Sequence, residues 1–225
     1  MYIDFTSSLH KQTKRDYLAR INDKTYPKYK AAKFAKKWGY DYWDGDRRIN
    51  YGGYKYIPGR WQKVAKKIIN HYKLKDGSKV LDIGCGKGFL LYEIYLINPN
   101  IEIYGIDISK YALKNSKPEI KKKLIYGNSN SLPFKRIFFD LAISLNTFHN
   151  LHSYDLFKSL TEIERVAKKK YICVESYKTE IQKMNLLYWQ VTCEAFNTPR
   201  EWKWWFKKSK YKGDYSFIFF EEKKR

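Results

Sequence analysis

The chain has 225 residues and a mass of 27.1 kDa, a length that fits one α/β domain with an appendage better than two independent domains. Hydrophobic residues make up 44% of the sequence and aromatic residues 18%, which excludes an intrinsically disordered chain. The net charge of +22 permits an anionic partner, nucleic acid included. A composition rich in lysine, isoleucine and tyrosine is also what an AT-rich coding sequence produces, so nucleic acid is not favoured.

The first part of the chain, residues 1–59, is irregular, aromatic and basic, and we interpret it as a lid or cap. Short helices are predicted at 16–21 and 28–37. The segment 38–61 then combines closely spaced glycines with aromatic rings, acids and arginines. Such glycine density forbids regular structure, and this composition supplies both unusual backbone angles and stacking area for a ligand. A loop that only packs on the rest of the protein is the alternative.

Residues 60–225 alternate between helical and strand patterns, and we predict that they form the main domain. Apolar side chains from Trp61 to Tyr72 recur on one helix face. Further helices are predicted at 89–96, 110–117, 154–167 and 199–208, the last opened by a capping box of Thr198 and Glu201. Strands are predicted at 79–83, 101–107, 124–126, 140–145, 171–175 and 216–220. The alternation predicts an α/β fold: a doubly wound, mostly parallel sheet with helices on both faces.

The turn after the first predicted strand carries the clearest chemical signal, and it reads Asp82-Ile83-Gly84-Cys85-Gly86-Lys87-Gly88. A dinucleotide-binding turn has its third glycine one place later and directs a helix N-terminus at a pyrophosphate. Asp82 would repel a pyrophosphate but could hold a cationic ligand. The block resembles motif I of the class I S-adenosylmethionine-dependent methyltransferases. The resemblance implies that S-adenosylmethionine is bound by Asp82, Gly84, Cys85, Gly86 and Gly88; tight helix–sheet packing without a cofactor is the alternative.

Further blocks follow in the order of that family, and the resemblance extends over residues 60–175. Asp107 ends the second predicted strand, where a carboxylate accepts hydrogen bonds from ribose hydroxyls, and Ile108 follows it. Asn128 and Ser129 lie in the loop after the third strand, where the family usually has an acid that recognises the adenine amine. An asparagine carbonyl can accept the same hydrogen bond. Leu145 ends the fourth strand beside the implied cofactor.

The remaining site residues flank this core. Tyr54 and Arg60 precede the first helix of the main domain and are expected to close over the cofactor, with Arg60 pairing its carboxylate. Asn146, His149 and Glu175 follow the fourth and fifth strands, on the rim where the methyl group should point. Either His149 or the nearby His152 could act as a base near neutral pH, and we name Asn146, His149 and Glu175 as the catalytic candidates.

These residues predict a methyltransferase that acts on a small molecule, either anionic or a sugar derivative. No recognised RNA-binding appendage accompanies the domain, and Asn146 is not followed by the Pro-Pro-aromatic sequence of enzymes that methylate amino groups of nucleic acids. The tryptophans of 202–205 fit helix packing better than base stacking. An RNA or other macromolecule methyltransferase is one alternative, and a non-catalytic cofactor-binding module is another.

Cysteine spacing and hydropathy limit the remaining possibilities. Cys85, Cys173 and Cys193 lie far apart, a spacing that suggests neither a disulfide framework nor a metal site. No stretch approaches the roughly 18 apolar residues of a membrane span, and charges occupy residues 1–20, where a signal peptide would be apolar. We therefore expect a cytoplasmic protein without a bound metal. The sequence does not set its oligomeric state.

Overall fold

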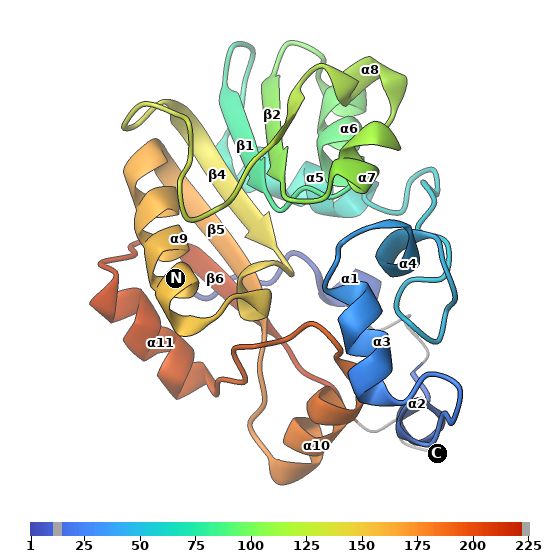
Figure 1. Cartoon of the computed structure of the whole chain (residues 1–225). Helices are drawn as coiled ribbons and strands as arrows, with labels where there is room; N and C mark the ends of the chain where they lie inside the picture. Colours follow the sequence, from blue (N-terminus) through green and yellow to red (C-terminus); the bar gives the residue numbers. More distant parts are fainter. Residues whose placement is uncertain (11–14, 222–225) are drawn as a thin grey trace.

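The computed structural model describes residues 1–10 and 15–221 of the chain. Within these residues six strands form one sheet in the order β3-β2-β1-β4-β5-β6 (Figure 1). The strands are β1 (Lys79–Ile83), β2 (Glu102–Asp107), β3 (Leu124–Tyr126), β4 (Phe139–Leu145), β5 (Ala167–Glu175) and β6 (Asp214–Ile218). Every neighbouring pair is parallel. The doubly wound α/β fold is thus confirmed, with a sheet that is parallel throughout.

Alternate side chains of the strands enter two apolar clusters, one on each face of the sheet. Val80 and Tyr171 pack with helices α5 (Gln62–Tyr72) and α6 (Phe89–Ile97). Leu81 and Ile172 pack with helices α9 (Ser153–Val166) and α11 (Pro199–Lys208) on the opposite face. Because side chains fill both faces, a ligand finds room at the carboxyl ends of the strands, where the strand order reverses between β1 and β4.

Several element boundaries differ from the prediction, and the largest shift at a strand end is that of β5, which begins at Ala167 rather than at residue 171. The predicted helix 110–117 is divided into α7 (Lys110–Lys114) and α8 (Pro118–Lys121), because Pro118 has no N–H to continue a helix and begins a new one instead. Strand β6 begins and ends two residues earlier than predicted. Helix α10 (Glu180–Trp189) was not predicted.

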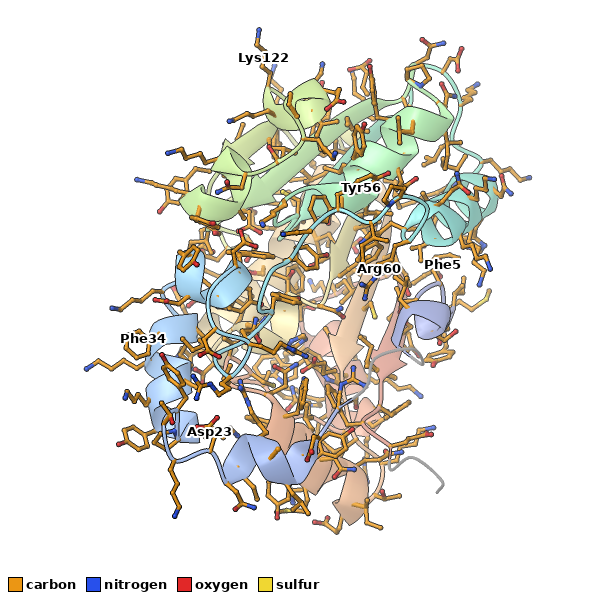
Figure 2. The ribbon with its side chains drawn as sticks, turned by 90° about the vertical axis from the view of Figure 1, so that its right-hand side faces the viewer. Phe5, Asp23, Phe34, Tyr56, Arg60 and Lys122 are labelled. Carbon is orange, nitrogen blue, oxygen red and sulfur yellow. The ribbon has the colours of Figure 1, made fainter. Side chains whose placement is uncertain are left out.

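We define residues 1–59 as the front segment, of which residues 15–59 lie at the carboxyl ends of the strands (Figures 1 and 2). It contains helices α1 (Ser7–His10), α2 (Tyr17–Ile21), α3 (Lys28–Ala35) and α4 (Tyr40–Trp43). The predicted absence of regular structure in 38–61 was therefore wrong for the turn of helix α4, whose buried Tyr42 and Trp43 join a third apolar cluster. That cluster also contains Ala112 and Val191, so it connects the front segment to the main domain.

The amino terminus is attached to the sheet rather than to the strand ends. The backbone N–H of Ile3 donates to the carbonyl of Tyr215 at 2.9 Å, and the N–H of Tyr215 donates to the carbonyl of Met1 at 3.0 Å. These bonds lie beside β6, so the front segment runs from the sheet edge to the strand ends. In the part of the chain that the structure describes, no helix has the length and apolar character needed to cross a membrane.

Candidate cofactor and acceptor site

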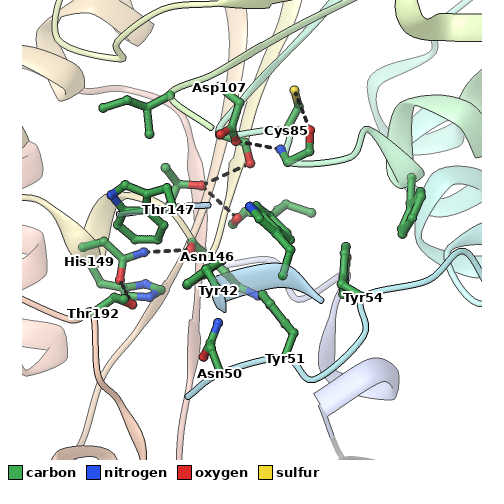
Figure 3. Close-up of a pocket in the computed structure, with 18 of the residues that line it drawn as sticks. Tyr42, Asn50, Tyr51, Tyr54, Cys85, Asp107, Asn146, Thr147, His149 and Thr192 are labelled. Carbon is green, nitrogen blue, oxygen red and sulfur yellow. Dashed lines mark hydrogen bonds between the residues drawn. The ribbon is translucent and has the colours of Figure 1, made fainter. Parts of the chain in front are cut away.

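A cavity of about 590 Å³ lies at the carboxyl ends of β1, β2, β4 and β5, within the size range of small-molecule and cofactor sites. The front segment lines one side of the cavity with aromatic rings, which include Trp43, Tyr51 and Tyr54. Figure 3 shows Asp107 toward one end of the pocket and His149 toward the other, with Tyr51 and Tyr54 across from them. The cavity therefore joins the predicted cofactor residues to the predicted catalytic residues.

The glycine turn after β1 lies in close contact with its neighbours. Gly84 and Gly86 both have a positive φ, at 78° and 56°, which favours glycine. A Cβ atom on Gly84 would lie 2.1 Å from Oγ1 of Thr147, and one on Gly86 would lie 2.6 Å from Cη2 of Trp43. Both glycines line the cavity, as Cys85 does. Gly88 lies under Ile120 and Leu124 instead, a place that fits its packing role.

Asp107 at the end of β2 holds this turn in place and also lines the cavity. Its carboxylate accepts hydrogen bonds from the backbone N–H groups of Gly86 and Ser109, each at 2.7 Å. Burial raises the pKa of Asp107, and the two hydrogen bonds oppose that rise. Each carboxylate oxygen has a further lone pair, so Asp107 can anchor the backbone and still accept from a ligand.

Asp82 at the end of β1 has a carboxyl oxygen without a hydrogen-bond partner, at the Asp107 end of the cavity. The residue is 5% exposed, and its Oδ1 atom is buried without a hydrogen bond. Burial and the nearby Asp107 raise the pKa of Asp82 to about 8. A buried acceptor without a donor is costly. A ligand that carries a cationic amine would satisfy it.

The other predicted cofactor residues lie along the edge of the cavity. Ile108 and Asn128 line it and are exposed, whereas the buried Ser129 directs its hydroxyl to Ser159 at 2.8 Å. Leu145 lines the cavity where β4 ends. These residues form a rim of mixed polarity next to Asp107.

Tyr54 and Arg60 also line the cavity, from the side of the front segment. The ring of Tyr54 stacks on Phe89 with centroids 5.1 Å apart, and burial raises the pKa of its hydroxyl. Figure 2 places Tyr56 and Arg60 on the stretch of chain that leads from the front segment back to helix α5. The structure thus brings both predicted residues to the site.

A buried ion pair that was not predicted fastens the front segment to the glycine turn. Nζ of Lys87 lies 2.8 and 2.7 Å from the two carboxylate oxygens of Asp44 and donates to the carbonyl of Tyr54 at 2.8 Å. Asp44 also accepts from the hydroxyl of Tyr111 at 2.8 Å. Burial raises the pKa of Asp44, but the bonds from Lys87 and Tyr111 lower it overall. We call these four residues the latch.

At the other end of the cavity, His149 and Glu175 form a buried pair. Nε2 of His149 lies 3.4 Å from Oε2 of Glu175, and the backbone N–H of Glu175 donates to Nδ1 of His149 at 3.4 Å. Burial raises the pKa of Glu175 to about 8, against a hydrogen bond from Gln190. The indole N–H of Trp202 donates to the Glu175 carbonyl at 2.9 Å, so this tryptophan packs and positions β5.

Asn146 and His152 differ in their relation to this pair. Asn146 lines the cavity with φ at 57°, and its Oδ1 atom is buried without a hydrogen-bond partner. The side chain of His152 is 76% exposed, and its Nδ1 atom lies 3.7 Å from Glu194. It does not line the cavity described above. Of the two histidines, His149 is therefore the one that the fold brings to the site.

Two arginines of the front segment also line the cavity, and sequence reasoning did not single them out. Arg15 and Arg47 lie near Trp189, the last residue of helix α10. The chain contains nine arginines among 45 basic residues. Arginine binds carboxylates and phosphates with a planar, bidentate donor, which lysine cannot offer. In a chain with so few arginines, each arginine was therefore a candidate binding residue, and this was the signal that could have found Arg15 and Arg47.

A family model described as a methyltransferase domain matches residues 74–210. This match covers more than half of the chain, and the chain belongs to that family. The membership confirms the resemblance drawn from the glycine turn and S-adenosylmethionine as the methyl donor. Among the described residues, no group of three or more histidine, cysteine or acidic side chains is placed to hold a metal ion.

Individual relatives differ in what they methylate. The chain is 30% identical over 138 residues to a demethylmenaquinone methyltransferase of Anoxybacillus flavithermus, covering 57% of this chain and 56% of that protein. It is 34% identical over 125 residues to the ribosomal RNA small subunit methyltransferase C of Buchnera aphidicola, covering 47% and 35%. The chain thus spans about half or less of the length of these two relatives.

Solved structures confirm the fold. A putative methyltransferase from Bacillus halodurans superimposes with a TM-score of 0.52 at 16% identity, over 64% of this chain and 67% of that chain. The residues before the family match, 1–73, include the whole front segment. The family match therefore does not include the aromatic rings of Trp43, Tyr51 and Tyr54, which cover the cavity and which we call its roof.

Proposed function

We propose that this member of the methyltransferase-domain family transfers the methyl group of S-adenosylmethionine to a small-molecule acceptor. The observation that carries the proposal is the shared cavity, which the unpartnered carboxyl of Asp82 and the buried pair of His149 and Glu175 both line. The rings of Trp43 and Tyr51 cover it from the front segment. An acceptor that reacts under this roof is expected to be small.

The residues at the Asp82 end fit the donor. Asp82 would accept a hydrogen bond from the amine of the donor, which would remove the free-energy cost of its buried, unpaired oxygen. Asp107 would accept hydrogen bonds from the ribose hydroxyls. Arg60 would pair the carboxylate. The remaining residues proposed to contact the donor are Tyr54, Gly84, Cys85, Gly86, Ile108, Asn128, Ser129 and Leu145, whereas Gly88 packs against Ile120 and Leu124. When bound, the donor supplies a methyl group on a positively charged sulfur.

The residues at the other end would position the acceptor and take its proton. The acceptor atom bonds to the methyl carbon as the carbon–sulfur bond breaks, and charge is lost in the process. Asn146 offers its unpartnered Oδ1 to a donor hydrogen of the acceptor. Both ring nitrogens of His149 face Glu175, so we assign proton uptake to the Glu175 carboxylate, with His149 holding it in place. Alignment in a desolvated pocket supplies the rest.

The macromolecule alternative has one observation in its favour: the net charge of +22 together with the similarity to a ribosomal RNA methyltransferase. A nucleic acid would need to reach the methyl group past the roof of aromatic rings. The latch closes that roof onto the glycine turn. We therefore favour the small molecule.

The experiment is turnover to S-adenosylhomocysteine with a low-molecular-weight metabolite extract, compared with total RNA at several salt concentrations. The proposal expects product with the extract and none with RNA. Product with RNA alone, weakened by salt, would establish the macromolecule alternative. Binding of S-adenosylmethionine without product from either source would leave a cofactor-binding module.

A pair of histidine variants tests the acceptor end. We expect His149→Gln to lower turnover about 100-fold, the typical worth of positioned proton transfer, without changing cofactor affinity. His152→Gln is the matched control and should keep full turnover, because its side chain is 76% exposed and does not line the cavity. Equal turnover in His149→Gln and the wild type would show either that Glu175 takes the proton without help from His149 or that the acceptor is already deprotonated and needs only alignment.

A further inference from the structure

We propose that the acceptor carries an anionic oxygen group, a carboxylate or a phosphate, which binds between Arg15 and Arg47 at the far end of the cavity. This inference rests on the proposed function, because it names the class of molecule that the same site would methylate. The two guanidinium groups belong to the front segment, whereas the glycine turn and the strand ends belong to the main domain.

Aromatic rings orient both guanidinium groups. Cζ of Arg15 lies 4.6 Å from the ring centroid of Phe220 and 5.9 Å from that of Trp189. Cζ of Arg47 lies 5.4 Å from the ring centroid of Trp189. A guanidinium held over an aromatic face keeps its N–H groups in its own plane, where they can form paired bonds to a carboxylate or phosphate.

The hydrogen bonds of these arginines leave donors for a ligand. The Nε atom of Arg15 is buried without a hydrogen-bond partner, although the residue lines the cavity. Arg47 donates from Nη1 to the carbonyl of Asn50, which fixes one edge of its guanidinium. A buried N–H without an acceptor is costly, and an oxyanion in the cavity would remove that cost.

The charges around the two arginines also call for an anion. Burial lowers the pKa of Arg15, and the nearby positive charge of Arg47 lowers it further. Tyr17, which hydrogen-bonds to Arg15, and Glu175 oppose this effect. Burial raises the pKa of Glu175 to about 8, so at pH 7 its carboxyl is mostly neutral. Arg15 and Arg47 thus lie next to a Glu175 carboxyl that is mostly neutral at pH 7, and an anionic ligand would supply a counter-charge beside them.

The acceptor then has two chemically different ends, each next to different residues of the cavity. Its anionic group would lie against Arg15 and Arg47, and its methyl-accepting atom would lie near Asn146 and Glu175. Thr192 also lines the cavity, and its hydroxyl donates to the amide oxygen of Asn150 at 2.8 Å. The inferred substrate is therefore a small molecule with an oxyanion and a separate proton-bearing nucleophile.

The test measures anion binding directly and needs no turnover. Inorganic phosphate and acetate are titrated calorimetrically into the full chain, with S-adenosylhomocysteine present and absent. We expect saturable binding at one site, weakened about ten- to a hundredfold in Arg47→Met and in Arg15→Met. Arg136→Met is the matched control, because Arg136 is exposed and does not line the cavity. Tighter binding of phosphate or of acetate identifies which oxyanion the site takes.

Several results would overturn the inference. These are no saturable binding of either anion to the wild type, equal binding in Arg47→Met, or an equal loss in Arg136→Met. Arg47→Lys guards against misfolding, since it keeps the charge and should bind between the wild type and Arg47→Met. A wild type that turns over an extract but binds neither anion refutes this inference alone. A wild-type protein that binds phosphate but never forms S-adenosylhomocysteine from any extract refutes the methyl-transfer proposal instead.

Discussion

Replacing Asp44 by alanine should detach the front segment from the glycine turn without unfolding the sheet. Lys87 is 5% exposed, and both carboxylate oxygens of Asp44 lie within 2.8 Å of its Nζ atom. In Asp44→Ala the ammonium keeps only the carbonyl of Tyr54, and the hydroxyl of Tyr111 loses its acceptor. The variant leaves a buried charge with little compensation, which is the costly way to break an ion pair.

The expected cost follows from this burial. Removing one partner of a buried ion pair costs about 3 to 5 kcal/mol, and the lower figure applies here because the Asp44 side chain is 21% exposed. Water can reach that side of the pair and solvate part of the charge. A loss of about 3 kcal/mol corresponds to roughly a 100-fold change in an equilibrium constant. Local opening of residues 38–55 should therefore become about 100 times more frequent.

Hydrogen exchange reports this opening at named amides. The N–H groups of Tyr51 and Gly53 donate to the carbonyls of Tyr42 and Trp43, at 3.2 and 3.1 Å, and both bonds must break when the segment opens. We expect their exchange to speed about 100-fold in Asp44→Ala, whereas amides of strand β1 should keep their protection. S-adenosylhomocysteine should restore part of the protection by filling the space beneath the roof.

Two controls separate the latch from a general loss of stability. Lys87→Met removes the buried charge itself and should cost less than Asp44→Ala, because Asp44 keeps its bond from Tyr111 and can reach solvent. Lys168→Met breaks an exposed pair with Asp140, whose side chains are 62% and 37% exposed, and should change nothing measurable. Two results would contradict this prediction: amide exchange of Tyr51 and Gly53 at the wild-type rate in Asp44→Ala, or an equal loss of protection in strand β1.

Two further predictions concern pH. Asp82 has a pKa of about 8, so its carboxyl is mostly protonated at pH 7 and must ionise to bind a cationic amine. The affinity for S-adenosylmethionine should therefore rise from pH 6 to 8, with release of about one proton on binding. Calorimetry in buffers of different ionisation enthalpy measures this proton release, and Asp82→Asn should remove the pH dependence. Because Glu175 also has a pKa of about 8, turnover should rise with pH, reach half its maximum near pH 8 and level off above about 9. Glu175→Gln should lower the plateau about 100-fold and flatten the profile, and an unchanged profile would exclude Glu175 as the proton acceptor.

Much of the fold could be predicted because local patterns determine it. The strand 79–83 matches β1, and the strand 124–126 matches β3. The helix at Pro199 begins where its capping box places it, with both Thr198–Glu201 bonds present. Helix α10 escaped prediction because its sequence, EIQKMNLLYW, mixes polar and apolar residues without a clear apolar stripe.

The two ends of the cavity were not equally predictable. The residues at the donor end follow strands that the sequence marks clearly, so a motif of seven consecutive residues places Asp82, Gly84 and Gly86 together. The latch joins Asp44 to Lys87, 43 positions away, and Arg15 meets the ring of Trp189 across most of the chain. Such contacts depend on how the front segment folds back, which no local period of the sequence records.

The donor end and the acceptor end differ in predictability because different parts of the chain form them. Donor binding, as we propose it, relies on backbone geometry at strand ends, where a Cβ on Gly84 would lie too close to Thr147 for a side chain to be accommodated. Acceptor binding, as we propose it, combines Asn146 and Glu175 of the main domain with Arg15 and Arg47, which come from outside the region that matches the methyltransferase family. A change of acceptor would then require changes in residues 1–59 rather than in the glycine turn. The latch couples the two ends, because its Lys87 belongs to the turn and its Asp44 lies three residues before Arg47.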